Sequence, residues 1–352
     1  MLLVLALAAA IWGLGRLMGA SRSARLYLLG LLYVAVLMIH VALPEGHGLR
    51  AATGGSAALW LLLGGFAGLV LVYRLGLGKL RARAQPQVDP APVSARMSDS
   101  ELDRYARHIV LRELGGPGQK KLRGARVLVV GAGGLGAPAL QYLAAAGVGT
   151  IGVIDGDVVE NANLQRQVIH TDARIGMPKV FSAQAAMLAQ NPHVTVRPYH
   201  RRLTEEIARE LFADYDLVLD GTDNFTTRYL VNRAAVAARL PLVSGALSQW
   251  EGQLSVFDPA RGAPCYQCLF PEAPAPGLAP SCAEAGVLGP LPGVVGAMMA
   301  VEAVKLIAGA GQPLRGEMLI YDALWGETRK IRLHRRADCP VCGAAAPDLA
   351  KP

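Results

Sequence analysis

Four of the five cysteines in this 352-residue sequence have the spacing of metal ligands. Cys265 and Cys268 form one CxxC pair, and Cys339 and Cys342 form a second. Two such pairs supply four thiolates, which is the donor set of a closed tetrahedral zinc site. Because 70 residues separate the pairs, tertiary structure must join them. The pattern predicts structural zinc, with four reduced thiols as the alternative. Hydrolysis at the metal is not expected, because a four-sulfur site has no open position.

A nucleotide-binding signature lies earlier, in the sequence GAGGLG. Its glycines are Gly131, Gly133, Gly134 and Gly136. Asp155 ends the apolar segment 150–155 that follows. Glycines permit a tight turn and close approach of a phosphate, and an acid at the end of the next strand can hold ribose hydroxyls. Taken alone, this pattern is commonest in NAD and FAD enzymes and favours an oxidoreductase.

The residues beyond Asp155 change that interpretation, because they carry charges that hydride transfer does not need. The polar residues that follow it are Asp157, Asn163, Arg166, Gln167 and Lys179. Arg166, as a fork, and Lys179, as a compact charge, can neutralise a triphosphate, although a solvated basic surface is the alternative. Asp223 follows a later strand and suits Mg²⁺, which takes few protein carboxylates; it could also cap the next helix.

These side chains need an alternation of strands and helices to position them. Residues 125–130 and 150–155 flank the glycines and an apolar helix, which makes a βαβ unit. Further strand candidates lie at 194–198, 216–221, 241–247, 252–258 and 317–323. This order predicts an α/β fold, a Rossmann-like and mostly parallel sheet with helices on both faces. Ser98 and Glu101 form a capping box that predicts a helix through about Leu114.

Charge divides the chain in two. Residues 1–83 contain eight basic residues and one acidic residue, whereas the remainder contains 27 basic and 26 acidic residues. The overall charge of +8 therefore belongs almost entirely to the amino-terminal part. The larger part has no bulk positive charge of the kind that nucleic acid requires, so no nucleic-acid partner is expected.

The amino-terminal part predicts an all-α transmembrane region. Residues 26–43 and 51–73 lack Asp, Glu, Lys and Arg, and a bilayer is crossed by about 20 such residues. Residues 1–15 are also uncharged, which gives about three helices within 1–83, with two spans as an alternative. A buried helical hairpin in a soluble protein is the other interpretation.

Basic residues predict the orientation of these helices. Arg16, Arg22 and Arg25 lie between the first two apolar stretches, and Arg74 begins a second basic group after the third. Both groups can face the cytoplasm if the amino terminus is outside. We therefore expect a multi-pass protein of the cytoplasmic membrane whose larger domain lies in the cytoplasm. The proline-containing residues 84–97 form a linker, and 98–352 form the catalytic domain.

Six short motifs, in order, resemble those of the ThiF/MoeB/HesA family of E1-like adenylyltransferases. They are RYARHIVL (104–111), the 24 residues from Gly156 to Lys179, GTDN (221–224), CYQC (265–268), AGVLGP (285–290) and CPVC (339–342). The similarity spans roughly residues 98–343. It implies attack of the carboxy-terminal glycine of a ubiquitin-like sulfur carrier, ending in Gly-Gly, on the α-phosphorus of MgATP. The products are an acyl-adenylate and pyrophosphate, for molybdopterin or thiamine sulfur transfer.

The resemblance also implies roles for single residues. Arg107 corresponds to an arginine that reaches the ATP of the other protomer, which implies a homodimer, although His108 stands where relatives usually have Gln. The two cysteine pairs are joined when the tail folds back. Cys282 corresponds to a cysteine with which some relatives bind the carrier covalently; a passive loop thiol is the alternative. No rhodanese-like domain follows, so a separate protein is expected to donate sulfur.

Other functions stay open from the sequence alone. An enzyme like the tRNA threonylcarbamoyladenosine dehydratase would share the fold, but the near-neutral larger domain and the intact cysteine pairs weigh against it. A non-catalytic membrane scaffold predicts loss of Arg166, Lys179 or Asp223, and all three are present. An NAD-binding oxidoreductase predicts tighter binding of NADH than of ATP.

Overall fold

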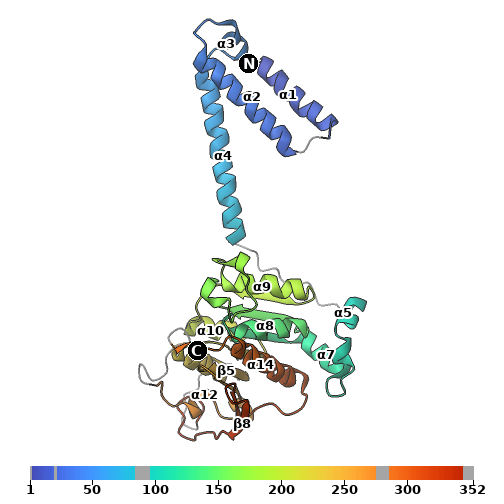
Figure 1. Ribbon diagram of the computed structural model, residues 1–352, viewed down its shortest axis with the longest axis vertical. Coiled ribbons are helices and arrows are strands. Elements are labelled where there is room, and N and C mark those ends of the chain that lie inside the picture. Colours follow the sequence, from blue (N-terminus) through green and yellow to red (C-terminus); the bar gives the residue numbers. More distant parts are fainter. Residues whose placement is uncertain (1, 20–21, 84–95, 275–284, 344–352) are drawn as a thin grey trace. The chain divides into compact units, whose positions relative to one another are not determined.

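The computed structural model divides the chain into two compact units, Met1–Val88 and Asp89–Pro352. The division falls within the expected linker, most of which lies outside the described residues. The structure describes residues 2–19, 22–83, 96–274 and 285–343 (Figure 1).

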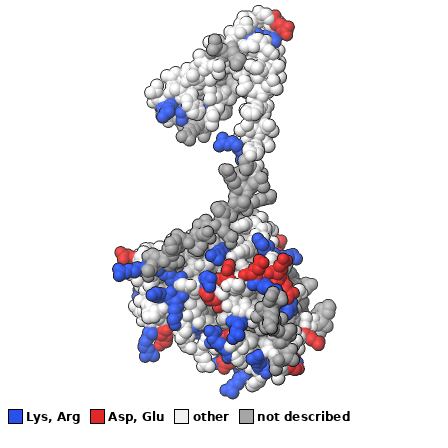
Figure 2. All heavy atoms as spheres, turned by 180° about the vertical axis from the view of Figure 1, so that it is seen from behind, with Lys and Arg blue, Asp and Glu red and all other residues white. Residues whose placement is uncertain are grey.

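The amino-terminal unit contains four helices: α1 (Leu2–Leu17), α2 (Arg22–Ala42), α3 (Gly48–Thr53) and α4 (Ala57–Arg83). By length and composition, α2 and α4 can each cross a membrane, while α1 is a shorter apolar helix. Only 17% of the most apolar stretch of α2 and 6% of that of α4 are buried inside the structure. Figure 2 shows this unit nearly free of charged residues except near the ends of its helices.

The second unit is built on one eight-stranded sheet in the order β3-β2-β1-β4-β5-β6-β7-β8. The first five strands of that order pair in parallel, and β6, β7 and β8 continue the sheet antiparallel. The strands are β1 (Arg126–Val130), β2 (Thr150–Ile154), β3 (Thr195–Tyr199), β4 (Leu217–Asp220), β5 (Leu242–Leu247), β6 (Glu251–Phe257), β7 (Glu317–Asp322) and β8 (Glu327–Arg332). The expected Rossmann-like, mostly parallel sheet is confirmed.

Helices cover both faces of the sheet because β1 and its parallel neighbours are apolar on both sides. On one face, Val127 and Val129 of β1 pack in a core with Leu140, Val180 and Met299. On the other face, a second core contains residues such as Leu128, Phe212 and Val231. The first core takes α8 (Gly136–Ala145), α9 (Lys179–Gln190) and α14 (Pro290–Ala308), and the second takes α10 (Glu205–Phe212) and α11 (Phe225–Ala237). Helix α14 is apolar enough to cross a membrane, but it packs inside this unit.

The segment before β1 differs from the prediction. The capping box of Ser98 and Glu101 is present, but its helix α5 (Asp99–Arg104) ends after six residues. The chain turns at Tyr105 because this buried side chain points inward, where its hydroxyl accepts a hydrogen bond from Asn191 at 2.8 Å. Two further helices follow, α6 (Ala106–Ile109) and α7 (Gly115–Gly124). The prediction of one helix through Leu114 was wrong.

Candidate active site

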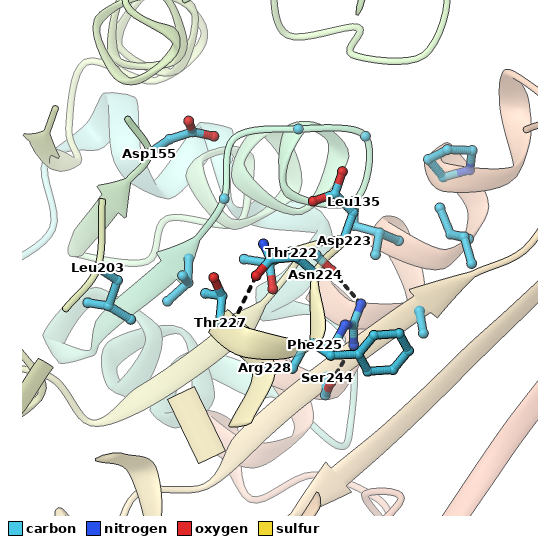
Figure 3. Close-up of a pocket in the computed structure, with 18 of the residues that line it drawn as sticks. Leu135, Asp155, Leu203, Thr222, Asp223, Asn224, Phe225, Thr227, Arg228 and Ser244 are labelled. Atoms are coloured by element: carbon cyan, nitrogen blue, oxygen red, sulfur yellow. Dashed lines mark hydrogen bonds between the residues drawn. The ribbon is translucent and has the colours of Figure 1, made fainter. Parts of the chain in front are cut away.

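A pocket of about 840 Å³ lies at the carboxyl ends of the parallel strands, where open α/β sheets bind ligands. Strand β1 leads into the glycine loop, β2 into Asp155, and β4 into the turn containing Asp223. Figure 3 shows Asp155 apart from the Thr222–Thr227 turn, with the glycine loop between them. The predicted residues that line the pocket are Gly131, Gly133, Gly134, Asp155, Asp157, Arg166, Gln167, Lys179 and Asp223.

Two glycines are required by the shape of the loop. Gly131 has φ +93°, a conformation that side chains rarely adopt. A Cβ on Gly136 would lie 1.9 Å from the carbonyl oxygen of Gly131, so this glycine lets α8 pack against the strand. Gly136 does not line the pocket, so the structure gives it this packing role, and its part in nucleotide binding stays a prediction.

Asp155 fixes the loop as well as facing the pocket. Its Oδ2 accepts a hydrogen bond from the amide of Ala132 at 2.8 Å, and its Oδ1 accepts one from the amide of Asp157 at 2.8 Å. Both bonds are to backbone groups, and each carboxylate oxygen keeps a further lone pair. The carboxylate can therefore hold the loop and still accept hydrogen bonds from ribose hydroxyls.

Lys179 is the more buried of the two predicted cations. Its side chain is 8% exposed, and Nζ lies 3.0 Å from the Oδ2 of Asp157, whose side chain is 59% exposed. Its amide also donates to the carbonyl of Asp157 at 3.0 Å. Arg166 is held by a hydrogen bond from Nη1 to the carbonyl of Ala162 at 2.9 Å. The two cations therefore face one pocket from α9 and from a loop.

Asn163 has a different position from its predicted neighbours. It is buried, it does not line the pocket, and its Oδ1 accepts from the amide of Glu160 at 3.3 Å. Its carbonyl accepts hydrogen bonds from the amides of Arg166 and Gln167. Asn163 thus forms the turn that presents these two side chains, and its direct contact with a nucleotide stays a prediction.

In the turn after β4, the adjacent residues Asp223 and Asn224 have different roles. Asn224 caps α11, with Oδ1 accepting from the amide of Thr227 at 2.9 Å. Asp223 is exposed and lines the pocket, and its carboxylate accepts no hydrogen bond within the part of the chain described. The capping alternative for Asp223 is therefore wrong, and its carboxylate is free to bind a cation such as Mg²⁺.

Arg228 was missed from the sequence, although it joins this turn to the sheet. It is buried, and its guanidinium donates to the carbonyls of Thr222 and Gly245 and to the Oγ of Ser244 (Figure 3). A buried arginine is stable only with such partners. One turn further along α11, the Oδ1 of the buried Asn232 accepts from the amide of Tyr266 at 2.9 Å. Helix α11 therefore connects the Asp223 turn with the cysteine region.

The four cysteines of the two CxxC pairs meet as predicted. Their Sγ atoms all lie within 4.8 Å of one another, and all four residues are buried. The Sγ separations are 3.9 Å for Cys265–Cys268, 3.6 Å for Cys265–Cys339 and 3.4 Å for Cys268–Cys342. A tetrahedral zinc ion with Zn–S bonds of 2.3 Å requires separations of about 3.8 Å. The cluster therefore fits zinc in both donor type and size.

Backbone groups assist one of these thiols. Burial alone would raise the pKa of Cys339, but the amides of Cys342 and Val341 lower it to about 7. A thiolate is the form that binds a metal, so this environment favours the ligand state.

Arg107 lies outside the pocket. It is exposed on α6, and within the described part of the chain it does not line the pocket. Its neighbour His108 bonds through Nδ1 to the Oε1 of Gln119 at 3.1 Å, so this histidine has an internal structural partner. Cys282 lies outside the described residues.

Comparisons with known proteins agree with this geometry. Residues 105–341 match the model of the ThiF family. The chain is 53% identical over 252 residues to the sulfur carrier protein adenylyltransferase of Thermus thermophilus, covering 70% of this chain and 93% of that protein. It is 50% identical over 249 residues to the SAMP-activating enzyme E1 of Haloferax volcanii, covering 71% and 92%. It is also 50% identical to the probable adenylyltransferase/sulfurtransferase MoeZ of Mycobacterium tuberculosis, covering 76% and 70%.

Solved structures share the fold at lower sequence identity. The complex of Escherichia coli MccB with AMPCPP and MccA has a TM-score of 0.61 and 22% identity, covering 72% of this chain and 77% of that one. The structure of PaaA has a TM-score of 0.60 and 22% identity, covering 83% and 91%.

Proposed function

We propose, since this chain belongs to the ThiF family, that it uses ATP to adenylate the carboxy-terminal glycine of a small ubiquitin-like sulfur-carrier protein. The observation that carries the proposal is a single pocket. It gathers the glycine loop, two cations and the unpaired carboxylate of Asp223 at the carboxyl ends of parallel strands.

The chemistry required of this pocket is the approach of two anions. An oxygen of the carrier's carboxylate forms a bond to the α-phosphorus of ATP, and the bond from that phosphorus to the bridging oxygen of pyrophosphate breaks. The carboxylate is already ionised, so no general base is needed, and charge neutralisation and positioning dominate. Lys179 and Arg166 would supply positive charge to the phosphates, and Gly133 and Gly134 line the same pocket. Mg²⁺ bound by Asp223 would neutralise further phosphate charge.

Small side chains contribute to the pocket lining. Ser244 and Ala246 of β5 and Ser255 of β6 lie among larger lining residues such as Gln253 and Phe257. A peptide ending in glycines carries no side chains that would clash there. The relatives named for sulfur carriers and for SAMP activation support a substrate of this class.

The pathway and the sulfur source extend this proposal. The relatives named adenylyltransferase/sulfurtransferase support a link between adenylation and sulfur transfer. The carrier would receive its sulfur for molybdopterin or thiamine synthesis. A separate protein would donate the sulfur, and Cys282 is the candidate thiol for a covalent bond to the carrier.

A homodimer would complete the site. Arg107 is too far around the fold to line its own pocket, yet it is exposed and able to reach a neighbour. Exposed apolar side chains elsewhere on this unit, such as Val168 and Val301, offer area for such an interface. The dimer would place the Arg107 of one protomer at the ATP of the other.

The amino-terminal helices would anchor the enzyme in the cytoplasmic membrane. Large side chains such as Leu17 and Leu62 are 86% and 73% exposed, which suits lipid rather than water. Within this unit, the carboxyl ends of α1 and α4 both lie away from α3 (Figure 1), and Arg16 and Arg74 belong to the carboxyl-terminal parts of these two helices. The positive-inside rule would then favour a cytoplasmic catalytic domain.

ATP–pyrophosphate exchange tests the proposal directly. Exchange by the full chain should depend on an added carrier ending in Gly-Gly, and a carrier lacking its last glycine should be inactive. tRNA should not replace the carrier. Exchange driven by tRNA would identify a dehydratase-like enzyme instead, and ATP binding without exchange by any carrier would identify a scaffold.

A further inference from the structure

His170 is a buried histidine to which the chemistry above assigns no task. It is 5% exposed, it does not line the pocket, and it lies between the glycine loop and α9. Its Nε2 lies 2.9 Å from the carbonyl oxygen of Ala132, and its Nδ1 lies 2.9 Å from the Oγ of the fully buried Ser182. A carbonyl oxygen only accepts, so Nε2 carries the proton and Nδ1 accepts from the Ser182 hydroxyl.

The Ala132 residue is consequently held from two sides. Its amide donates to the Oδ2 of Asp155 at 2.8 Å, while its carbonyl accepts from His170 at 2.9 Å. In a trans peptide the carbonyl and the next amide point in opposite directions. Because the carbonyl of Ala132 points at His170, which is outside the pocket, the N–H of Gly133 points to the opposite side.

That opposite side is the pocket. Gly133 lines it, and within the described residues its amide has no hydrogen-bond acceptor. A free amide at the start of α8 is a ready-made donor to a phosphate. The direction of this donor is set by a histidine that never touches the ligand.

We propose that His170 is the positioning residue of the phosphate-binding loop, aiming the Gly133 amide at the triphosphate. The proposal rests on the ATP site of the proposed function. Ser182, whose hydroxyl donates to Nδ1, lies on the same helix that carries Lys179, so one buried network joins the two phosphate-binding elements. Three charged groups surround the ring: Lys179 on α9, Arg174 in the preceding turn and Asp155 after β2.

Binding of ATP and adenosine to the full chain tests this role, because only ATP carries phosphates. Displacement of a fluorescent ATP analogue should show that His170→Ala raises the Kd of ATP about tenfold, as for loss of one hydrogen bond to a charged group. The Kd of adenosine should change less than twofold. His170→Gln retains a donor and an acceptor and should recover most of the ATP affinity. His193→Ala, at an exposed histidine whose ring Nε2 lies 3.4 Å from the Oγ of Ser100, is the matched control.

Equal losses of ATP and adenosine affinity in His170→Ala would mean a merely structural role and would overturn the proposal, as would an unchanged Kd for ATP. If His170→Ala does not fold, the same two Kd values measured for Ser182→Ala test the proposal. This variant should raise the Kd of ATP about threefold, as for one neutral hydrogen bond, and leave adenosine unaffected; no change for ATP would again refute the role. The readout contains no carrier, so failure to find an adenylated carrier would not affect it.

Discussion

Replacing Lys179 by methionine should separate catalysis from stability. The ammonium of Lys179 is paired with Asp157 at 3.0 Å, but the Asp157 side chain is 59% exposed and can be solvated when left alone. Loss of the pair should therefore cost at most about 1 kcal/mol of folding free energy. Methionine keeps the apolar stem of a side chain that is only 8% exposed, so packing is largely preserved.

The effect on the reaction should be much larger. Removing one preorganised charged donor from developing phosphate charge costs about 3 kcal/mol, or roughly a hundredfold in kcat/KM. Carrier-dependent ATP–pyrophosphate exchange measures this loss, and urea unfolding measures the stability. Lys330→Met is the matched control, because Lys330 of the exposed strand β8 forms a 3.1 Å pair with Glu317 of β7, and neither residue lines the pocket. Exchange by Lys179→Met within twofold of the parent enzyme would refute the assignment of this lysine to the phosphates.

Four further outcomes follow from the structure. Cys339→Ser should remove zinc, measured by metal analysis, and lower the Tm by roughly 5–10 °C, because binding free energy at a structural site is folding free energy. Burial lowers the pKa of His170 below its ordinary value of 6.5. The fold therefore disfavours the charged ring, and the free energy of urea unfolding of the parent should fall as the pH drops below 6.5, whereas His170→Gln should lose less stability over that range. Arg228→Met leaves buried carbonyls unpaired and should cost about 2–3 kcal/mol in urea unfolding. Mixing inactive Arg107→Ala and Lys179→Met chains should restore about a quarter of parental exchange if Arg107 acts in the partner's site, because half of the dimers then contain one intact site in two.

The parts of the site that the sequence predicts are those whose signal is local. The glycine loop and Asp155 lie within one strand–helix–strand segment, Lys179 begins the helix α9 that follows it, and each residue type suits a contact with a nucleotide. The zinc cysteines are distant in sequence, but four thiols in two CxxC pairs permit one grouping. The parallel strand order then brings the glycine loop, Asp155 and Lys179 to one edge of the sheet.

The parts that the sequence misses depend on contacts made only in the fold. His170 and Ala132 are 38 residues apart, and nothing in either residue type indicates that one orients the other. Strand β8 was not predicted because all six of its residues are exposed, so it has no apolar alternation, and its only strand pairing is with β7. The capping box at Ser98 was predicted correctly, but the prediction that its helix continues to Leu114 was wrong. The buried side chain of Tyr105, which bonds to Asn191, turns the chain after six helical residues.

These omissions share a physical cause that bears on how the site works. The residues expected to touch ATP are presented by loops and turns, which cannot hold an angle without support. The support comes from buried polar side chains on the neighbouring elements: His170 for the glycine loop, Arg228 for the Asp223 turn and Asn163 for the Arg166 turn. Each of them bonds to at least one backbone group, so each fixes the direction of a donor or a carboxylate rather than supplying one. Two anions can then meet in a pocket whose positive charges and amides are already oriented, and less reorganisation remains to be made during the reaction. Substitutions at these supporting residues should therefore lower the affinity for phosphates before they remove any group that binds them.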